Sequence, residues 1–102
     1  MYRIVWEYDV RPEEVTQFEQ VYGSDGLWVK FFHNSEDYLG TELFRSAVQP
    51  NRFITLDRWR SRVAYENFRK NYAADYAHLD DWCERLVEHE RTLGVTDDGK
   101  DG

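Results

Sequence analysis

Trp59 and Tyr65 have side chains and a spacing that could serve chemistry. An indole can stack on a planar aromatic compound, and a phenol can donate a hydrogen bond to an oxygen of that compound. A donor placed where negative charge develops would stabilise a substrate anion. The alternative is that both rings pack in the core, as aromatic side chains at this spacing usually do.

Asp57 is a second candidate because its strand neighbours are apolar. A regular strand places Thr55 and Asp57 on the same face as Phe53 and Trp59. A carboxylate beside apolar rings has a raised pKa and could act as a base. The alternative is an ion pair with one of three nearby arginines, Arg58, Arg60 and Arg62.

His78 is the histidine with the most suggestive surroundings. Asp75, His78 and Asp81 recur every three residues, which places them on one helical face, within reach of a metal ion or of each other. No second histidine lies one turn away, so the spacing favours a His78 that lines a pocket or faces solvent over a metal ligand. His33 and His89 carry no motif.

The elements that must position these residues follow from hydrophobic periodicity. Residues 2–10 alternate as a strand, and residues 38–48 and 52–59 form two further strands joined by a turn. Pro12 and Gly23 bracket a first helix. A second helical region covers residues 62–84 with a break near Asn71, Ser61 is placed to cap it, and residues 86–95 form a final strand.

Residues 23–37 form a less regular connection. The segment LWVKFF is typical of a single helical turn, and a connection of this length could also serve as a lid or binding loop. We favour the structural interpretation, in which three rings fill the end of the core: Trp28, Phe31 and Phe32.

This order of elements predicts a ferredoxin-like α+β domain with a four-stranded antiparallel sheet and both helices on one face. Residues 1–95 form a single domain, and residues 96–102 a flexible polar tail. Ile54 and Leu56 point to one face of the sheet, while Phe53 and Trp59 point to the other. Because helices cover only one face, we expect a second copy of the chain to cover the other, as a homodimer.

Charge and composition exclude several classes of function. The net charge of -7 disfavours binding to nucleic acid and to anionic membranes, and no apolar stretch approaches the roughly 20 residues of a membrane span. Cys83 is the only cysteine, which fits a reducing compartment. The N-terminal residues enter a strand pattern directly, without the order of a signal peptide, so a cytoplasmic location is expected.

The strand-to-helix corner resembles a known family. Trp59, Ser61, Ala64 and Tyr65 form the pattern W-x-S-x-x-A-Y, which is similar to the same corner in antibiotic-biosynthesis monooxygenase-like domains. The segments FITLDRW, VRPEE and YLGTEL also look similar, and the resemblance covers most of residues 2–95. It implies a dimeric α/β barrel in which each subunit holds a pocket between its sheet and its helices.

Two branches of that family suggest different chemistry for these positions. Quinone-forming monooxygenases without a cofactor surround a phenolic substrate with a tryptophan, a tyrosine, an asparagine and an arginine. Trp59 and Tyr65 match the first two, while Thr55 and Leu79 occupy the other two positions. In the heme-degrading branch, His78 falls near the histidine ligand, and the tryptophan and asparagine positions fall on Phe68 and near Trp6.

We therefore expect a cofactor-independent monooxygenase that acts on a small aromatic or polycyclic compound and needs no metal. Its catalytic residues would be Trp59 and Tyr65, and its substrate-binding residues would be Trp6, Phe53, Thr55, Phe68 and His78. One alternative is a non-catalytic dimeric barrel that binds a hydrophobic ligand or heme. Another is a structural or interaction domain with a filled core.

Overall fold

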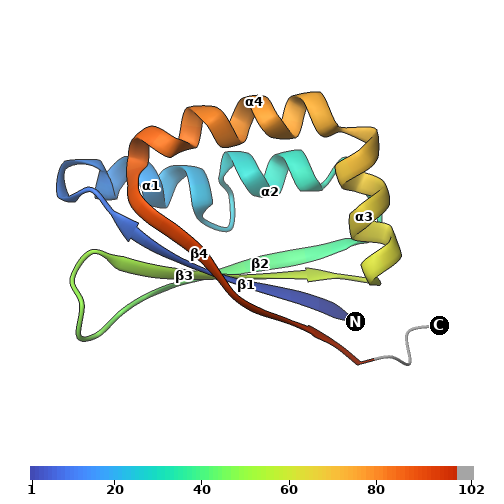
Figure 1. Cartoon of the computed structure of the whole chain (residues 1–102), viewed down its shortest axis with the longest axis horizontal. Coiled ribbons are helices and arrows are strands. Elements are labelled where there is room, and N and C mark those ends of the chain that lie inside the picture. The colour runs from blue at the N-terminus through green and yellow to red at the C-terminus, as the bar shows by residue number, and fades with distance from the viewer. Residues whose placement is uncertain (99–102) are drawn as a thin grey trace.

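The computed structural model describes residues 1–98 (Figure 1). The strands within this range are β1 (Tyr2–Val10), β2 (Tyr38–Arg45), β3 (Arg52–Trp59) and β4 (Val87–Asp97). The helices are α1 (Val15–Tyr22), α2 (Leu27–Phe32), α3 (Arg62–Asn71) and α4 (Ala73–Cys83), and short 3-10 turns cover Pro12–Glu14 and Glu84–Leu86. No helix in this part of the chain is long and apolar enough to cross a membrane.

The strands pair as one antiparallel sheet in the order β2-β3-β1-β4. Figure 1 shows the helices stacked on one face of this sheet, with α4 running above α1 and α2 and with α3 at one end. This arrangement confirms the predicted ferredoxin-like α+β fold. β1 and β3 are the two central strands of this sheet.

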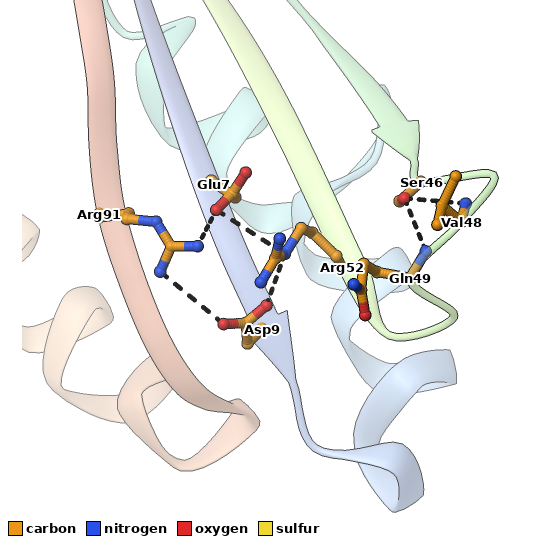
Figure 2. Close-up of polar contacts among 7 residues, drawn as sticks. All are labelled: Glu7, Asp9, Ser46, Val48, Gln49, Arg52 and Arg91. Carbon is orange, nitrogen blue, oxygen red and sulfur yellow. Dashed lines mark hydrogen bonds and ion pairs between the residues drawn. The ribbon is translucent and has the colours of Figure 1, made fainter.

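The predicted strand ends differ from the observed ones by two residues or more at two places. β2 ends at Arg45, earlier than residue 48, because the Ser46 hydroxyl accepts hydrogen bonds from the amides of Val48 and Gln49 at 3.1 and 2.9 Å and starts the turn (Figure 2). β4 continues through Asp97, which pairs with β1, so the expected tail cannot begin at residue 96. The rest of that tail, residues 99–102, lies outside the described residues.

The corner between β3 and α3 is formed as the sequence predicts. The Ser61 hydroxyl accepts a hydrogen bond from the Ala64 amide at 3.1 Å and caps α3. Trp59, just before the cap, is the last residue of β3 and has an exposed fraction of 0%. The break in the helical region falls at Tyr72, one residue beyond Asn71.

The connection between α1 and β2 fills the end of the core. LWVKFF forms α2, in which Trp28 and Phe32 are buried and Phe31 packs against the core while partly exposed. The Phe32 ring contacts the Trp59 ring with centroids 5.4 Å apart, and the Phe31 ring contacts Phe68 at 5.0 Å. The structural interpretation of this segment is confirmed.

The face of the sheet opposite the helices is apolar at its centre and charged towards both ends. Val5 lies opposite Leu56, and Phe44 lies opposite Ile54; we call these four side chains the open-face patch. Next to this patch, Arg52 and Arg91 form ion pairs with the carboxylates of Glu7 and Asp9 (Figure 2). Arg52 Nε lies 2.9 Å from the nearer carboxylate, that of Asp9. Apolar side chains on both faces of the sheet are confirmed.

Candidate functional site

A cavity of about 150 Å³ lies between the sheet and the helices. Its walls come from strands and helices that are far apart in the sequence. The sheet contributes Trp6, Tyr8, Thr55, Asp57 and Glu90, and the helices contribute Tyr22, Trp28, Phe32, Arg69, Tyr76 and Asp80.

Strand alternation brings the sheet side of this cavity together. Residues two apart on a strand share a face, so Trp6 and Tyr8 on β1 and Thr55 and Asp57 on β3 all point towards the helices. Trp6 lies opposite Thr55 in the register of these two strands. The Tyr8 and Thr55 hydroxyls are within 3.3 Å of each other, and burial raises the pKa of Tyr8 well above its usual value, so this phenol stays neutral.

Asp57 is a carboxylate in the cavity wall that is only 8% exposed. Its Oδ1 accepts a hydrogen bond from the Thr41 hydroxyl at 2.6 Å. Because Thr41 has only one hydroxyl proton, the Tyr38 hydroxyl must donate to Thr41. These hydrogen bonds run from the Tyr38 hydroxyl through the Thr41 hydroxyl to the Asp57 carboxylate, and they hold that carboxylate in one orientation.

The charge of Asp57 is not neutralised by any ion pair within residues 1–98. Burial raises its pKa to about 6, although the hydrogen bond from Thr41 acts in the opposite direction. The alternative of an arginine partner is wrong, because each of the three nearby arginines pairs with another carboxylate. The pairs are Arg58 with Glu42, Arg60 with Asp37, and Arg62 with Glu66. Asp57 therefore has the properties of a general base that titrates near neutral pH.

Charged groups surround the outer part of the cavity. Arg69 donates a hydrogen bond to the Tyr65 hydroxyl at 2.9 Å, and its guanidinium carbon lies 3.7 Å from the centroid of the Tyr76 ring. Burial raises the pKa of Asp80, and the Arg69 charge partly offsets this rise. Glu90 lies at the exposed rim, where partial burial and the charge of Asp80 raise its pKa.

The predicted site residues do not all meet at this cavity. Trp6 and Thr55 line it. Phe53, Trp59 and Phe68 are core residues that are at most 3% exposed and do not form its walls, because their rings pack between sheet and helices. Tyr65 does not line the cavity, but its hydroxyl accepts a hydrogen bond from Arg69, which does.

His78 lies elsewhere on the molecule. It is exposed on α4 in a separate shallow groove, together with Leu27, Asp75, Leu79, Asp81 and Trp82. Among the described residues, no group of three or more histidine, cysteine, aspartate or glutamate side chains could hold a metal ion. The position of His78 therefore does not support a role for its side chain at the cavity.

Several cavity residues were not predicted from the sequence. Tyr8 could have been found, because it shares the alternating face of Trp6 on β1. Arg69, Asp80 and Glu90 carry no such signal, because α3, α4 and β4 bring them together only after folding.

Comparisons with known proteins agree with this architecture. Residues 1–85 match the sequence profile of the family described as antibiotic biosynthesis monooxygenase, while no curated protein matches the chain. A mutant form of SnoaB, a cofactor-independent oxygenase from Streptomyces nogalater, superimposes with a TM-score of 0.77 at 15% identity, covering 93% of this chain and 89% of SnoaB.

Two further solved structures share the fold. A conserved protein from Methanosarcina mazei Go1 gives a TM-score of 0.74 at 12% identity, over 94% of this chain and 90% of that protein. A protein described as an antibiotic biosynthesis monooxygenase gives 0.71 at 15% identity, over 95% of this chain and 97% of its own. Identities this low support the fold alone.

Proposed function

The chain belongs to the antibiotic biosynthesis monooxygenase family, and from this premise we propose that it is a cofactor-independent monooxygenase of a small aromatic compound. The observation that carries the proposal is Asp57, a buried carboxylate without an ion-pair partner in residues 1–98, in the wall of a cavity rich in aromatic rings. SnoaB, described as a cofactor-independent oxygenase, has a similar fold.

The proposed reaction begins with proton transfer to Asp57. Trp6, Tyr22 and Trp28 provide ring surfaces against which an aromatic substrate can stack. Asp57 then accepts a proton from a substrate hydroxyl. The hydroxyls of Tyr8 and Thr55 lie on the same wall and are hydrogen-bonded to each other. The one that accepts this bond can donate its own proton in a hydrogen bond to the substrate anion and stabilise it.

The substrate anion supplies the electrons that reduce dioxygen, so the balance needs no further reductant. For a hydroquinone, one oxygen atom of dioxygen enters the ring and the other leaves as water, while the ring is oxidised to a hydroxyquinone. The hydrogens also balance. The two hydroxyl protons of the hydroquinone and the ring hydrogen that is replaced supply the two hydrogens of water and the hydrogen of the new hydroxyl. Asp57 returns its proton when the peroxide O–O bond breaks and water departs.

Oxygen uptake with hydroquinone tests this function. We expect uptake above the uncatalysed rate, and an enzymatic rate that rises with pH through about 6, because Asp57 accepts a proton only when ionised and its pKa is about 6. Uptake is measured between about pH 5 and pH 8, with the rate without protein subtracted. No enzymatic uptake, or a rate that falls as pH rises through this range, would contradict the proposal.

The predicted catalytic roles of Trp59 and Tyr65 can be tested in the same assay. We propose that Tyr65 acts by holding Arg69 at the rim through its hydroxyl, and that Trp59 supports β3 from the core. Tyr65→Phe should then slow the reaction modestly, whereas direct participation of either side chain predicts that Tyr65→Phe or Trp59→Phe abolishes it.

The site does not favour heme as a ligand. A cavity of about 150 Å³ is the size that holds one benzene molecule in an engineered protein core, which is far too small for a porphyrin. His78 is exposed outside this cavity, so the residues present do not fit a heme site there. We therefore propose that the reaction at this cavity does not use heme.

We further propose that the protein is a homodimer in which the open-face patch is covered by a second copy. Phe44 is 47% exposed, and burial of such apolar side chains favours association. Sedimentation should give about twice the 12.3 kDa chain mass, and Ile54→Asp should shift the protein towards monomer because it places a charge within the patch. Val48→Asp is the control, since Val48 is 84% exposed in the turn after β2. A monomeric wild-type protein at micromolar concentration would contradict this.

A further inference from the structure

The charged side chains around the cavity indicate the charge of the ligand, in addition to its aromatic character. Of the charged side chains that line the cavity, three are carboxylates, Asp57, Asp80 and Glu90, and one is a guanidinium, Arg69. Asp80 and Glu90 form no ion pair with another described residue. The guanidinium of Arg69 is already placed over the Tyr76 ring and bonded to the Tyr65 hydroxyl. The site therefore has an excess of negative charge that a ligand could neutralise.

The positions of the carboxylates divide the cavity into two parts. Asp57 is buried in the wall, whereas Glu90 is exposed and Asp80 is partly exposed at the opening. Glu90 lies directly across from Tyr8 on the neighbouring strand, so its carboxylate stands at the sheet side of this opening, while Asp80 extends from α4. Asp57, the inner carboxylate, suits a hydroxyl of the ligand. Asp80 and Glu90, the outer carboxylates, suit a cationic group of the ligand.

The volume of the cavity limits the ring system. About 150 Å³ corresponds to one benzene-sized ring by comparison with an engineered protein cavity. The Trp6 ring, which lines the cavity and is partly exposed, can also attract a cation through its π-electrons. One ring inside and a charged substituent at the opening would use both parts of the site.

We propose that the ligand of this cavity is a phenol or hydroquinone with a single ring and a protonated amine side chain. Its hydroxyl lies near Asp57, and its ammonium group lies between Asp80 and Glu90. The mutual repulsion of these two carboxylates is part of the reason for the raised pKa of Glu90, and an ammonium group between them relieves it. This inference rests on the proposed function only for the choice of cavity.

Equilibrium binding of three phenols tests the inference. The probes are tyramine, p-cresol and 4-hydroxyphenylacetate, which share a phenol ring and differ in the charge of the substituent. Near neutral pH and at low salt, titration calorimetry should give tyramine about tenfold tighter binding than p-cresol, and 4-hydroxyphenylacetate the weakest binding of the three, by Coulomb attraction and repulsion. The advantage of tyramine should shrink as salt is added.

Variants test whether Asp80 and Glu90 cause the preference for tyramine. Asp80→Asn together with Glu90→Gln should remove most of the advantage of tyramine over p-cresol without weakening p-cresol binding. The matched control is Asp81→Asn with Glu88→Gln, which makes the same charge change at neighbouring positions that do not line the cavity. These side chains are exposed or partly exposed, and unchanged thermal melting would show that the variants fold.

The results separate the inference from the proposed function. Equal affinity for tyramine and p-cresol, no binding of any probe, or an equal loss of preference in the control variant would overturn the inference. Enzymatic oxygen uptake with neutral hydroquinone but without an amine preference would overturn it and leave the function standing. A clear amine preference without uptake on neutral or aminoethyl hydroquinone would support the inference and reject the oxygenase.

Discussion

Asp57→Asn is expected to lower the rate of enzymatic oxygen uptake by about 10² to 10⁴-fold, because general base catalysis contributes on this scale. An asparagine amide is close in size to the carboxylate and can still accept the hydrogen bond from Thr41, but it cannot accept the substrate proton. The variant should therefore keep the shape of the cavity and lose its base. Steady-state rates and the binding of p-cresol measure the two properties separately.

The same substitution is expected to stabilise the folded protein near neutral pH. The pKa of Asp57 rises from 3.8 to about 6 on folding, so its contribution to stability is fully present below about pH 4 and is lost as pH rises through about 6. A shift of about two units corresponds to about 3 kcal/mol at pH 7. Asp57→Asn avoids this cost, and its free energy of unfolding should exceed that of the wild type at pH 7 but not at pH 4.

Asp98→Asn provides a control of opposite sign. A hydrogen bond from Arg3 lowers the pKa of Asp98, so neutralising Asp98 should slightly destabilise the protein at pH 7. Urea unfolding of both variants at the two pH values gives the comparison. An Asp57→Asn variant that keeps the wild-type rate would show that Asp57 is not the base. A variant that loses stability at pH 7 would contradict the raised pKa of Asp57.

Trp59→Ala is expected to destabilise the fold by about 3 to 5 kcal/mol, the usual cost of removing a large buried ring. Trp59 has an exposed fraction of 0%, and its ring has four aromatic neighbours with centroids 5.2 to 5.4 Å away, Phe32, Tyr38, Tyr65 and Phe68. Its removal leaves a cavity at the junction of sheet, α2 and α3. Denaturant unfolding measures the loss.

Two variants complete this test. Trp82→Ala is the control, because Trp82 is 37% exposed and its loss should cost much less. Trp59→Phe should also be milder, since it keeps a ring and removes an indole N–H that has no hydrogen-bond partner in residues 1–98. If Trp59→Phe instead abolished oxygen uptake while melting normally, the indole would take part in the reaction.

The fold could be predicted from the sequence because its signals are local. Alternation along residues 2–10 and 52–59, Pro12 and Gly23 around the first helix, and the Ser61 cap each depend on a few neighbouring residues. The same alternation predicted which strand faces are apolar, and the structure confirms this for Ile54 and Leu56 on one face and for Phe53 and Trp59 on the other.

The site was predicted only in part, because sequence spacing does not reveal which side of a buried layer is open. Trp6 and Thr55 do line the cavity, whereas Trp59 and Phe68 fill the core beside it. The raised pKa of Asp57 could be anticipated from its apolar neighbours. Its lack of an arginine partner could not, because that depends on Glu42, Asp37 and Glu66 taking up the nearby arginines.

The order of the strands, the faces of β1 and β3, and the position of Asp57 on the buried face all follow from local sequence patterns. That Asp80 on α4 and Glu90 on β4 line the same cavity as Arg69 depends on how the elements pack together. Periodicity fixes directions within one element. Distances between elements are set by how side chains pack, and the charge of the cavity depends on those distances.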